Sequence, residues 1–482
     1  MPDFRPIFFV IGLLMVTLAV GMCLPAVVDI VRGDDDWKAF AASAGGTMFI
    51  GVSLVLTCRS DDMQLTIRQA FLLTSLSWIV LTAFAALPFT FSKLEMSFTD
   101  SFFEAMSGIT TTGATVITGL DFAPPGILLW RAVLQWLGGI GIIVMAIAVL
   151  PMLRVGGMQL FRMESSDQSD KVLPRAAQIA SSIGLIYVAL TVIWTGLLWF
   201  AGMGKLEAVA HAMTTIATAG FSTADASIGH FDSAAIDWII TFGMMMSGLP
   251  FVLYLQAVRG RPFDLLRDSQ VRWFLSILWS VIGVLVLWQV FANGEPWLDA
   301  LRYVAFNVTS VMTGTGFATA DYDQWGTFAI VMFFVVMFIG GCAGSTTCGI
   351  KIFRFQVLYA MAATQMKALL QPHGVFIPQF NNRPIPDTVG LSVLTFFFSF
   401  VFCFGLLAMG LGLAGLDFLT AVSGAATAIS NVGPGLGPII GPSGNFATLP
   451  DSAKWMLSAG MLIGRLEVLT VLILFMPAFW KE

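Results

Sequence analysis

Long apolar runs alternate with short polar turns along the whole chain, and this pattern predicts a protein that crosses a membrane many times. Runs of about 20 apolar residues are long enough to span a bilayer as helices. We expect ten such spans, at residues 8–31, 39–57, 70–90, 127–153, 178–202, 235–258, 272–293, 326–366, 388–413 and 453–478.

Four shorter amphipathic segments interrupt this order, and each ends in a polar turn that contains glycine. They begin near Asp100, Glu207, Asp299 and Asp417, and they are too short to cross a bilayer. The turns are Thr111-Thr112-Gly113-Ala114-Thr115, Thr218-Ala219-Gly220-Phe221-Ser222, Thr313-Gly314-Thr315-Gly316-Phe317 and Ser430-Asn431-Val432-Gly433-Pro434. A span, a half-helix, a turn and a second span are typical of a re-entrant pore loop, here repeated four times.

These elements predict an all-α polytopic membrane protein with two extra N-terminal helices and four parallel span, pore-loop, span repeats around a pseudo-fourfold pore. We expect the helix pair at 1–65 and the repeats at 66–165, 166–262, 263–372 and 373–482. A single Thr-Thr-Gly stretch is more often a helix contact in lipid than a filter. Four stretches in the same register favour the pore.

Composition supports a membrane protein and excludes several other classes. Hydrophobic residues make up 57% of the chain and charged residues only 11%, whereas soluble domains carry roughly 25% charged residues. The net charge of −5 indicates no nucleic-acid partner. The five cysteines and three histidines are scattered, so no metal cluster is expected. No nucleotide-binding motif, catalytic triad or acid pair indicates a cofactor site or an enzyme.

The distribution of basic residues predicts the orientation. Sixteen of the 24 lysines and arginines fall on one side of the predicted spans, seven on the other side, including Arg131, and Arg465 lies within a span. The richer side is expected to be cytoplasmic. Both termini then lie in the cytoplasm, and the four turns face outward.

The turns carry the candidate chemistry. A cation enters a membrane only if other groups replace its water, and rings of backbone carbonyls do so without adding fixed charge. Glycine allows the backbone angles that such a ring requires. The half-helix before each turn directs its negative end toward the pore, which favours a cation. The candidate filter residues for K⁺ are Thr111, Thr112, Gly113, Thr218, Ala219, Gly220, Gly314, Thr315, Gly316, Asn431, Val432 and Gly433.

A second candidate site is a gate beneath the filter. Small residues at 340–350 interrupt the apolar run 326–366, so the helix is expected to unwind there, although a packed kink is an alternative. Arg465 and Glu467 lie inside the last span, where ionisable residues are costly. We hypothesise that Arg465 opposes cation passage in the closed state and that Glu467 helps to hold it; a structural arginine is the alternative. The candidate gate residues are Gly340, Gly341, Gly344, Ser345, Thr346, Thr347, Gly349, Lys351, Arg465 and Glu467.

The chain resembles the Trk/Ktr/HKT superfamily of potassium transporters, and within it the Trk-type membrane subunits. The four glycine turns, the extra N-terminal helix pair, the stretch 340–351 and Gly464-Arg465-Leu466-Glu467 carry the resemblance, which covers about residues 5–480. It implies potassium permeation and an intramembrane gating loop. Gly113, where sodium-selective relatives place serine, fits the potassium-permeable members. Cys348 departs from the family, which usually has glycine there.

The resemblance also implies partners and a location. It implies a homodimer in the lipid of a bacterial inner membrane, regulated by a TrkA-like cytosolic subunit that binds NAD(H) and ATP. Candidate docking charges are Arg154, Arg162, Lys171, Arg175, Arg354 and Lys367. Passive flux, ion-coupled symport, a sodium-selective transporter and a substrate-coupled carrier of another solute remain alternatives. Inverted repeats are common in solute carriers, so four parallel repeats favour the cation pore.

Overall fold

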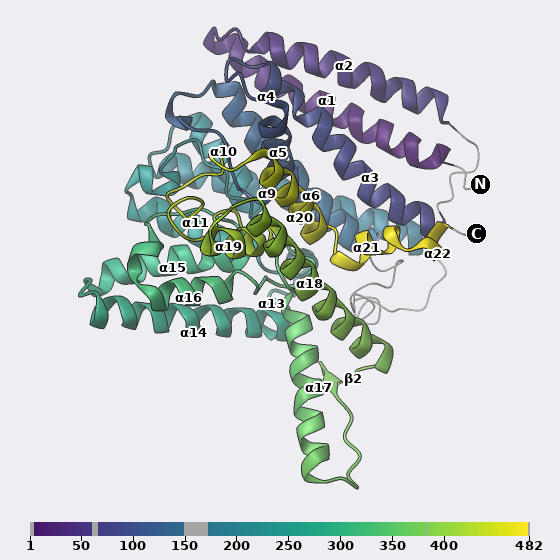
Figure 1. Ribbon diagram of the computed structural model, residues 1–482, viewed down its shortest axis with the longest axis vertical. Helices are drawn as coiled ribbons and strands as arrows, with labels where there is room; N and C mark the ends of the chain where they lie inside the picture. The colour runs from purple at the N-terminus through teal and green to yellow at the C-terminus, as the bar shows by residue number, and fades with distance from the viewer. Residues whose placement is uncertain (1–3, 60–65, 149–171, 382, 481–482) are drawn as a thin grey trace.

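The computed structural model describes residues 4–59, 66–148, 172–381 and 383–480, which form an almost entirely helical protein (Figure 1). The longer helices are α1 (Arg5–Arg32), α2 (Trp37–Thr57), α3 (Ile67–Ala85), α5 (Phe98–Ile109), α6 (Pro125–Ala148), α9 (Val172–Phe200), α10 (Lys205–Ile216), α11 (Ala234–Ser247), α14 (Ser269–Ala292), α15 (Trp297–Thr313), α16 (Thr327–Val336), α17 (Ile352–Leu370), α18 (Asp387–Leu413), α19 (Phe418–Ser430) and α20 (Asp451–Arg465).

Short elements connect these helices. They are α4 (Leu87–Phe91), α12 (Phe251–Val258), α13 (Asp264–Arg267), α21 (Val468–Leu472), α22 (Pro477–Trp480), the 3-10 turns η1 (Leu120–Phe122), η2 (Ser227–Phe231), η3 (Tyr322–Trp325) and η4 (Ile473–Phe475), and the antiparallel strands β1 (Gln379–Phe380) and β2 (Arg383–Pro384).

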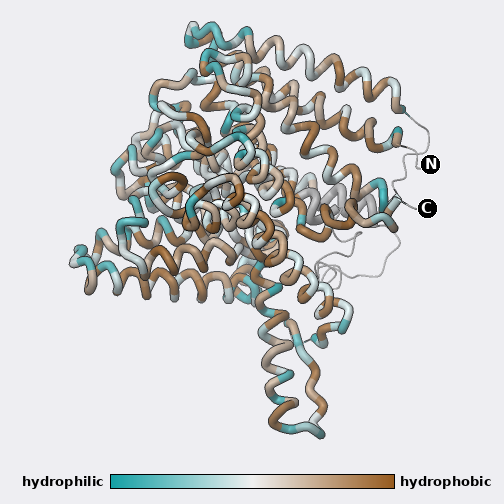
Figure 2. The backbone as a smooth tube through the Cα atoms, viewed as in Figure 1, coloured by the Kyte–Doolittle hydropathy of each residue, from teal (hydrophilic) through white to brown (hydrophobic). Residues whose placement is uncertain are grey.

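The number of apolar helices agrees with a multi-pass membrane protein. Seven described helices are long and apolar enough to cross a membrane, and two bent helix pairs raise that number to nine. The one remaining predicted span, 326–366, corresponds to α16 and α17, which a non-helical segment separates. Figure 2 shows hydrophobic residues along the outer helix α14, where Leu287 and Phe291 are exposed as lipid-facing side chains would be.

The four predicted half-helices are α5, α10, α15 and α19, with 12, 12, 17 and 13 residues. A 12-residue helix is about 18 Å long, so it crosses only part of a bilayer. Each packs against the spans of its own repeat, as α5 does against α3 and α6 and α19 does against α18 and α20. The half-helices therefore end inside the protein.

Breaks in the second spans differ from the prediction. The spans 235–258 and 453–478 were expected to be continuous, but α11 and α12 meet at 94°, and α20 and the segment Val468–Phe475 meet at 112°. Pro250 lacks the N–H that a continuing helix needs and clashes with the preceding turn. In the last span Glu467 has a φ of 66°, which ends the helix. Unwinding in repeat three was predicted at 340–350, and the chain there is non-helical from the end of α16 at Val336 to the start of α17 at Ile352.

One helical segment projects from the body of the protein. Figure 1 shows α17 and the chain that returns through β1 and β2 extending well beyond the other helices. Leu369, Leu370 and Val375 near its tip are mostly exposed.

Glycines on the second spans allow the half-helices to approach the filter region closely. A methyl group on Gly138 of α6 would overlap the carbonyl oxygen of Ile109 at the end of α5. One on Gly464 of α20 would overlap the carbonyl oxygen of Ile429 near the end of α19. Small residues serve this purpose at helix contacts in lipid, because backbones can then come together.

We therefore expect Gly138→Ala to lower the free energy of unfolding by about 1–3 kcal/mol, because the new methyl group meets backbone rather than a movable side chain. Thermal unfolding of the detergent-purified protein measures this. Gly141→Ala is the matched control, since a methyl group there has no neighbour within 4 Å. Equal melting temperatures for the two variants would contradict the close approach.

Candidate functional site

The four predicted turns share one backbone conformation. In each central triplet the first residue lies in the left-handed region, and the third is a glycine with a positive φ. The φ values are 54° at Thr111, 49° at Thr218, 68° at Gly314 and 52° at Asn431, and they are 87° at Gly113, 79° at Gly220, 86° at Gly316 and 110° at Gly433. Left-handed backbone is rare for residues other than glycine and asparagine, so its recurrence indicates a common geometry.

Each half-helix ends in the same pair of backbone hydrogen bonds. The first triplet N–H donates to the carbonyl three residues earlier, and the second donates to the carbonyl five residues earlier, which is the Schellman ending of a helix. The first set of bonds joins Thr111 to Gly108, Thr218 to Thr215 and Gly314 to Val311, all at 3.0 Å, and Asn431 to Ala428 at 3.3 Å. The second set joins Thr112 to Ser107 at 2.9 Å, Ala219 to Thr214 at 3.0 Å, Thr315 to Ser310 at 2.8 Å and Val432 to Thr427 at 3.0 Å.

The triplets contact one another in a closed cycle. A methyl group on Gly113 would lie 2.5 Å from the carbonyl oxygen of Ala219, and one on Gly220 would overlap that of Thr315. A methyl group on Gly316 would overlap the carbonyl oxygen of Val432, and one on Gly433 would lie 2.8 Å from that of Thr112. Repeat one thus touches repeat two, two touches three, three touches four, and four touches one. The structure therefore brings the twelve candidate filter residues together in one ring.

The segment between α16 and α17 folds back on itself beneath this ring. Its two ends form an isolated parallel bridge between Ile339 and Ile350. The N–H of Gly340 donates to the carbonyl of Ile350 at 2.9 Å, and the N–H of Ile350 donates to that of Phe338 at 3.1 Å. These bonds close the segment into a loop that contains the candidate gate residues 340–349.

The loop is anchored in the break between α11 and α12. The N–H of Cys342 donates to the carbonyl of Gly248 at 3.0 Å, and the N–H of Phe251 donates to that of Gly344 at 2.9 Å. The amide oxygen of Gln270 accepts the N–H of Ala343 at 3.0 Å. The bend in repeat two therefore supplies backbone partners to the loop of repeat three.

The loop also touches the filter triplets. Thr218 donates its hydroxyl to that of Thr346 at 3.1 Å, and the hydroxyl of Thr111 lies 3.5 Å from the sulfur of Cys348. A methyl group on Gly314 would lie 3.1 Å from Cβ of Cys348. Three of the four left-handed residues, Thr111, Thr218 and Gly314, thus lie next to the loop.

Arg465 joins three repeats below the ring. Its guanidinium lies 2.7 Å from the sulfur of Cys348 and donates to the carbonyls of Thr346 at 3.4 Å and Gly138 at 3.2 Å. The side chain is 4% exposed, and Nε is buried without a hydrogen-bond partner. Lys351 also points back into the loop, where its ammonium group donates to the carbonyl and hydroxyl of Thr347.

Glu467 has no described hydrogen bond or ion pair with Arg465. Glu467 instead forms an ion pair with Arg354 on α17, and the Arg354 guanidinium lies 3.6 Å from the ring centroid of Phe396. A largely buried carboxylate requires a cation, and α17 supplies it from another repeat. Because Arg354 is itself only 1% exposed, it is also not the accessible docking charge that we expected.

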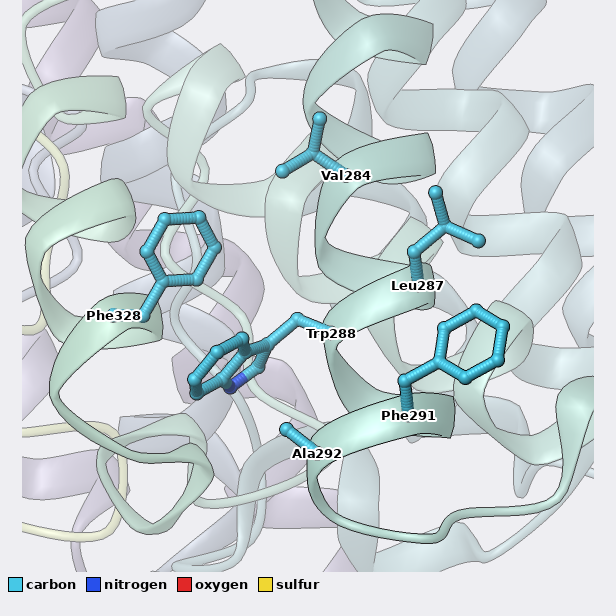
Figure 3. Close-up of a pocket in the computed structure, with 6 residues that line it drawn as sticks. All are labelled: Val284, Leu287, Trp288, Phe291, Ala292 and Phe328. Carbon is cyan, nitrogen blue, oxygen red and sulfur yellow. The ribbon is translucent and has the colours of Figure 1, made fainter.

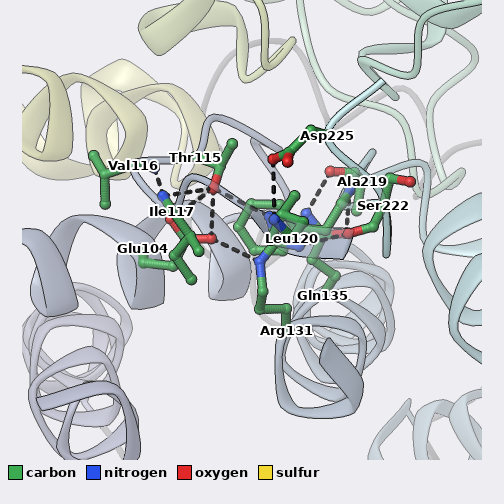
Figure 4. Close-up of polar contacts among 11 residues, drawn as sticks. Glu104, Thr115, Val116, Ile117, Leu120, Arg131, Gln135, Ala219, Ser222 and Asp225 are labelled. Carbon is green, nitrogen blue, oxygen red and sulfur yellow. Dashed lines mark hydrogen bonds and ion pairs between the residues drawn. The ribbon is translucent and has the colours of Figure 1, made fainter. Parts of the chain in front are cut away.

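An ion pair that the sequence did not reveal supports the outer side of the ring. Glu104 on α5 and Arg131 on α6 are both buried, with 2.8 Å between Oε1 and Nε. Glu104 also accepts the N–H of Val116 at 2.9 Å, and Arg131 donates to the carbonyl of Ser222 at 2.6 Å (Figure 4). Arg131 entered the orientation count only as an outer-side charge, although an ionisable residue within the apolar run 127–153 is a signal of such a role.

An acidic side chain ties two outer segments together. Asp323 in η3 accepts the N–H of Gly437, beyond the fourth triplet, at 2.7 Å. Burial, opposed by this hydrogen bond and assisted by the charge of Asp321, raises the pKa of Asp323 to about 6. Its carboxyl group therefore takes up a proton as the pH falls through about 6.

Among the described residues, neither a metal-binding cluster nor the apolar pocket adds a site at the ring. In the described part of the chain, no group of three or more His, Cys, Asp or Glu residues could hold a metal ion. A pocket between α14 and α16 has apolar walls of Val284, Leu287, Trp288, Phe291, Ala292 and Phe328 (Figure 3). It contains none of the candidate filter or gate residues.

The fold and the ring of turns define a multi-pass membrane transporter with four pore-loop repeats. The chain belongs to the TrkH family, described as "Cation transport protein", whose profile matches residues 38–482. This membership confirms that the chain is a transporter and not an enzyme.

Named relatives match the chain along almost its whole length. It is 47% identical to "Trk system potassium uptake protein TrkI" of Halomonas elongata over 479 residues, which are 99% of this chain and 97% of that protein. It is 39% identical to "Trk system potassium uptake protein TrkH" of Escherichia coli strain K12, over 99% of this chain and all of that protein. The crystal structure of the potassium transporter TrkH from Vibrio parahaemolyticus superposes with a TM-score of 0.92 at 36% identity and covers both chains completely. These matches confirm the predicted fold class.

The buried ion pair leads to a stability prediction. We expect Glu104→Gln to lower the free energy of unfolding by about 3–5 kcal/mol, because Arg131 then stays buried without its carboxylate. Thermal unfolding in detergent measures the loss. Asp35→Asn is the control, since the Lys38–Asp35 pair is largely exposed and such pairs contribute little. A loss no larger than that of the control would show that the ion pair is not needed for folding.

Proposed function

We propose that the chain takes up potassium through the ring of backbone carbonyls formed by its four triplets. The observation that carries this proposal is the closed cycle in which each filter glycine meets the carbonyl oxygen of the next repeat. Four such oxygens, from Thr112, Ala219, Thr315 and Val432, lie together where four half-helices end.

Physical chemistry supports a monovalent cation as the passenger. The idealised cost of moving a small ion from water into a low-dielectric interior is of order 20 kcal/mol, so the ring has to replace lost water. Carbonyl oxygens do this, and the negative ends of the half-helices add to the attraction. Neutral ligands of this kind hold the ion weakly enough for it to leave again.

The relatives and the filter sequence favour potassium. Two of the relatives named above are potassium uptake proteins. Glycine stands in all four triplets, including Gly113, where the family places serine in sodium-selective members. A sodium-selective transporter and a carrier of another solute are the alternatives that the test below separates.

The direct test uses the pure full-length chain in lipid vesicles, with and without a candidate cytosolic subunit. We expect uptake of radioactive rubidium, a potassium substitute, to exceed uptake of radioactive sodium. Sodium uptake at an equal or greater rate would favour the sodium-selective alternative. Uptake of neither ion under any of these conditions would overturn the proposal in favour of the solute carrier.

We also propose that the loop 340–350, together with Lys351 and Arg465, is the gate. The loop touches Thr111 and Thr218 of the filter, and Arg465 bonds to the loop and to α6. The guanidinium contributes a positive charge beneath a ring proposed to carry cations. Glu467 acts through Arg354, which fixes the bend that positions Arg465.

Regulation and assembly form the remaining part of the proposal. We propose that two copies associate in a bacterial inner membrane, with the termini in the cytoplasm, and that a TrkA-like subunit supplies NAD(H) or ATP binding. The projecting apolar surface of α17 supports a contact between copies, and the exposed Lys367 near its end suits a docking role. Arg154, Arg162 and Lys171 lie outside the described residues, as does the side chain of Arg175.

The filter leads to a transport prediction. We expect Gly220→Ala to reduce rubidium uptake at least about tenfold, because the methyl group would displace the carbonyl of Thr315 and the residue would resist a φ of 79°. Gly119→Ala is the control: its φ of 72° imposes the same backbone strain, but a methyl group there meets no neighbour within 4 Å. Similar uptake by both variants would contradict the filter.

The gate leads to a second transport prediction. We expect Arg465→Ala to raise rubidium uptake in the absence of any cytosolic subunit about tenfold, because a positive charge no longer opposes the cation. The vesicle assay measures this, with the folded fraction checked by size-exclusion chromatography. Unchanged uptake by well-folded protein would show that Arg465 has only a structural role.

A further inference from the structure

The side chain of Gln135 forms hydrogen bonds to the backbone on both sides of Gly220, the glycine of the second triplet. The side chain lies on α6 in repeat one, one helical turn after Arg131, and is completely buried. Its Nε2 donates to the carbonyl of Ala219 at 2.5 Å, and its Oε1 accepts the N–H of Phe221 at 2.9 Å (Figure 4). One amide from repeat one therefore spans Gly220 of repeat two.

This contact makes one position of the ring different from the other three. The described hydrogen bonds include none to the carbonyl oxygens of Thr112, Thr315 or Val432. In repeats three and four, a hydroxyl instead binds a carbonyl one or two residues further on. Ser310 donates to Phe317 at 2.6 Å, and Thr427 donates to Gly433 at 3.0 Å.

A side-chain donor on a ring carbonyl has two physical effects. It occupies one of the two acceptor positions of the oxygen and holds that oxygen in place. In a buried site such a hydrogen bond is stronger than in water, so it limits how far the carbonyl can move. Discrimination between K⁺ and Na⁺ depends on the size and stiffness of the carbonyl ring.

We propose that Gln135 is a specificity-determining positioning residue, which tethers the Ala219 carbonyl and so keeps the ring too wide and too stiff to close around sodium. It acts through the backbone of repeat two and does not itself replace the water of the ion. This inference rests on the proposed potassium uptake. It adds that selectivity depends on one asymmetric contact between repeats one and two.

The test compares two variants of the full chain in vesicles. Gln135→Leu removes both contacts at similar size, whereas Gln135→Glu keeps an acceptor for the N–H of Phe221 but places a carboxyl oxygen against the carbonyl of Ala219. We expect both to raise the ratio of sodium to rubidium uptake about fivefold, because both lose the one neutral hydrogen bond that holds the Ala219 carbonyl. Melting temperature and elution profile give the folded fraction.

Gln289→Leu is the matched control. Gln289 is a buried amide on α14 that accepts a hydrogen bond from Asn293, away from the filter. Its loss is expected to leave the uptake ratio unchanged. A ratio that changes as much in this variant as in Gln135→Leu would show that any lost buried amide has the effect, and would overturn the proposal.

The remaining outcomes are decisive. Wild-type selectivity in a folded Gln135→Glu or Gln135→Leu protein would overturn the tether. Failure of both variants to fold would overturn it as well, because Gln135 would then be a folding residue. Absence of rubidium uptake by the wild-type chain would overturn the proposed function itself, which is a different result from selective uptake that the variants leave unaltered.

Discussion

The close contact between a glycine of one repeat and a peptide oxygen of the next is the constraint on which this structure depends. At Gly220 and Gly316 even a methyl group would overlap the neighbouring carbonyl oxygen. Glycine is therefore required for space as well as for its positive φ. Gly138 of α6 and Gly464 of α20 lie farther from the axis, where they let the ends of α5 and α19 pack close to the second spans. The Glu104–Arg131 pair then fixes the backbone that follows the first two triplets, at Val116 and Ser222.

Fourfold similarity holds at the ring and ends directly beneath it. The four triplets repeat the same φ values and the same helix ending, but the second spans bend at 94° in repeat two, unwind over a whole loop in repeat three and bend at 112° in repeat four. Unwound backbone at membrane depth is tolerated only where its polar groups find partners within the protein. Here the two breaks supply partners to each other. The N–H of Cys342 in repeat three donates to the carbonyl of Gly248 in repeat two, and the N–H of Phe251 in repeat two donates to that of Gly344 in repeat three.

The sequence predicted most of the fold because its signals are local. Apolar runs mark the spans, and a short amphipathic segment followed by a glycine turn marks each half-helix. The bends at Pro250 and Glu467 were missed, although proline inside an apolar run is itself a local signal. The partners of the buried charges could not be predicted, because they join residues far apart in the chain. Arg131 meets Ser222 across 91 positions, and Arg354 meets Glu467 across 113.

The pairing of Glu467 with Arg354 explains how Arg465 could act as a barrier. If Glu467 bonded directly to Arg465, the carboxylate would cancel most of the positive charge that a cation meets below the filter. Instead the described hydrogen bonds of Arg465 go to the carbonyls of Thr346 and Gly138 and to the sulfur of Cys348. Such acceptors orient the guanidinium and leave its charge uncompensated. Two like charges 4 Å apart repel by about 4 kcal/mol at an effective dielectric constant of about 20, so a modest displacement of this one side chain changes the barrier considerably. A loop that holds Arg465 through one backbone carbonyl and a single thiol can release it by moving, without having to break an ion pair.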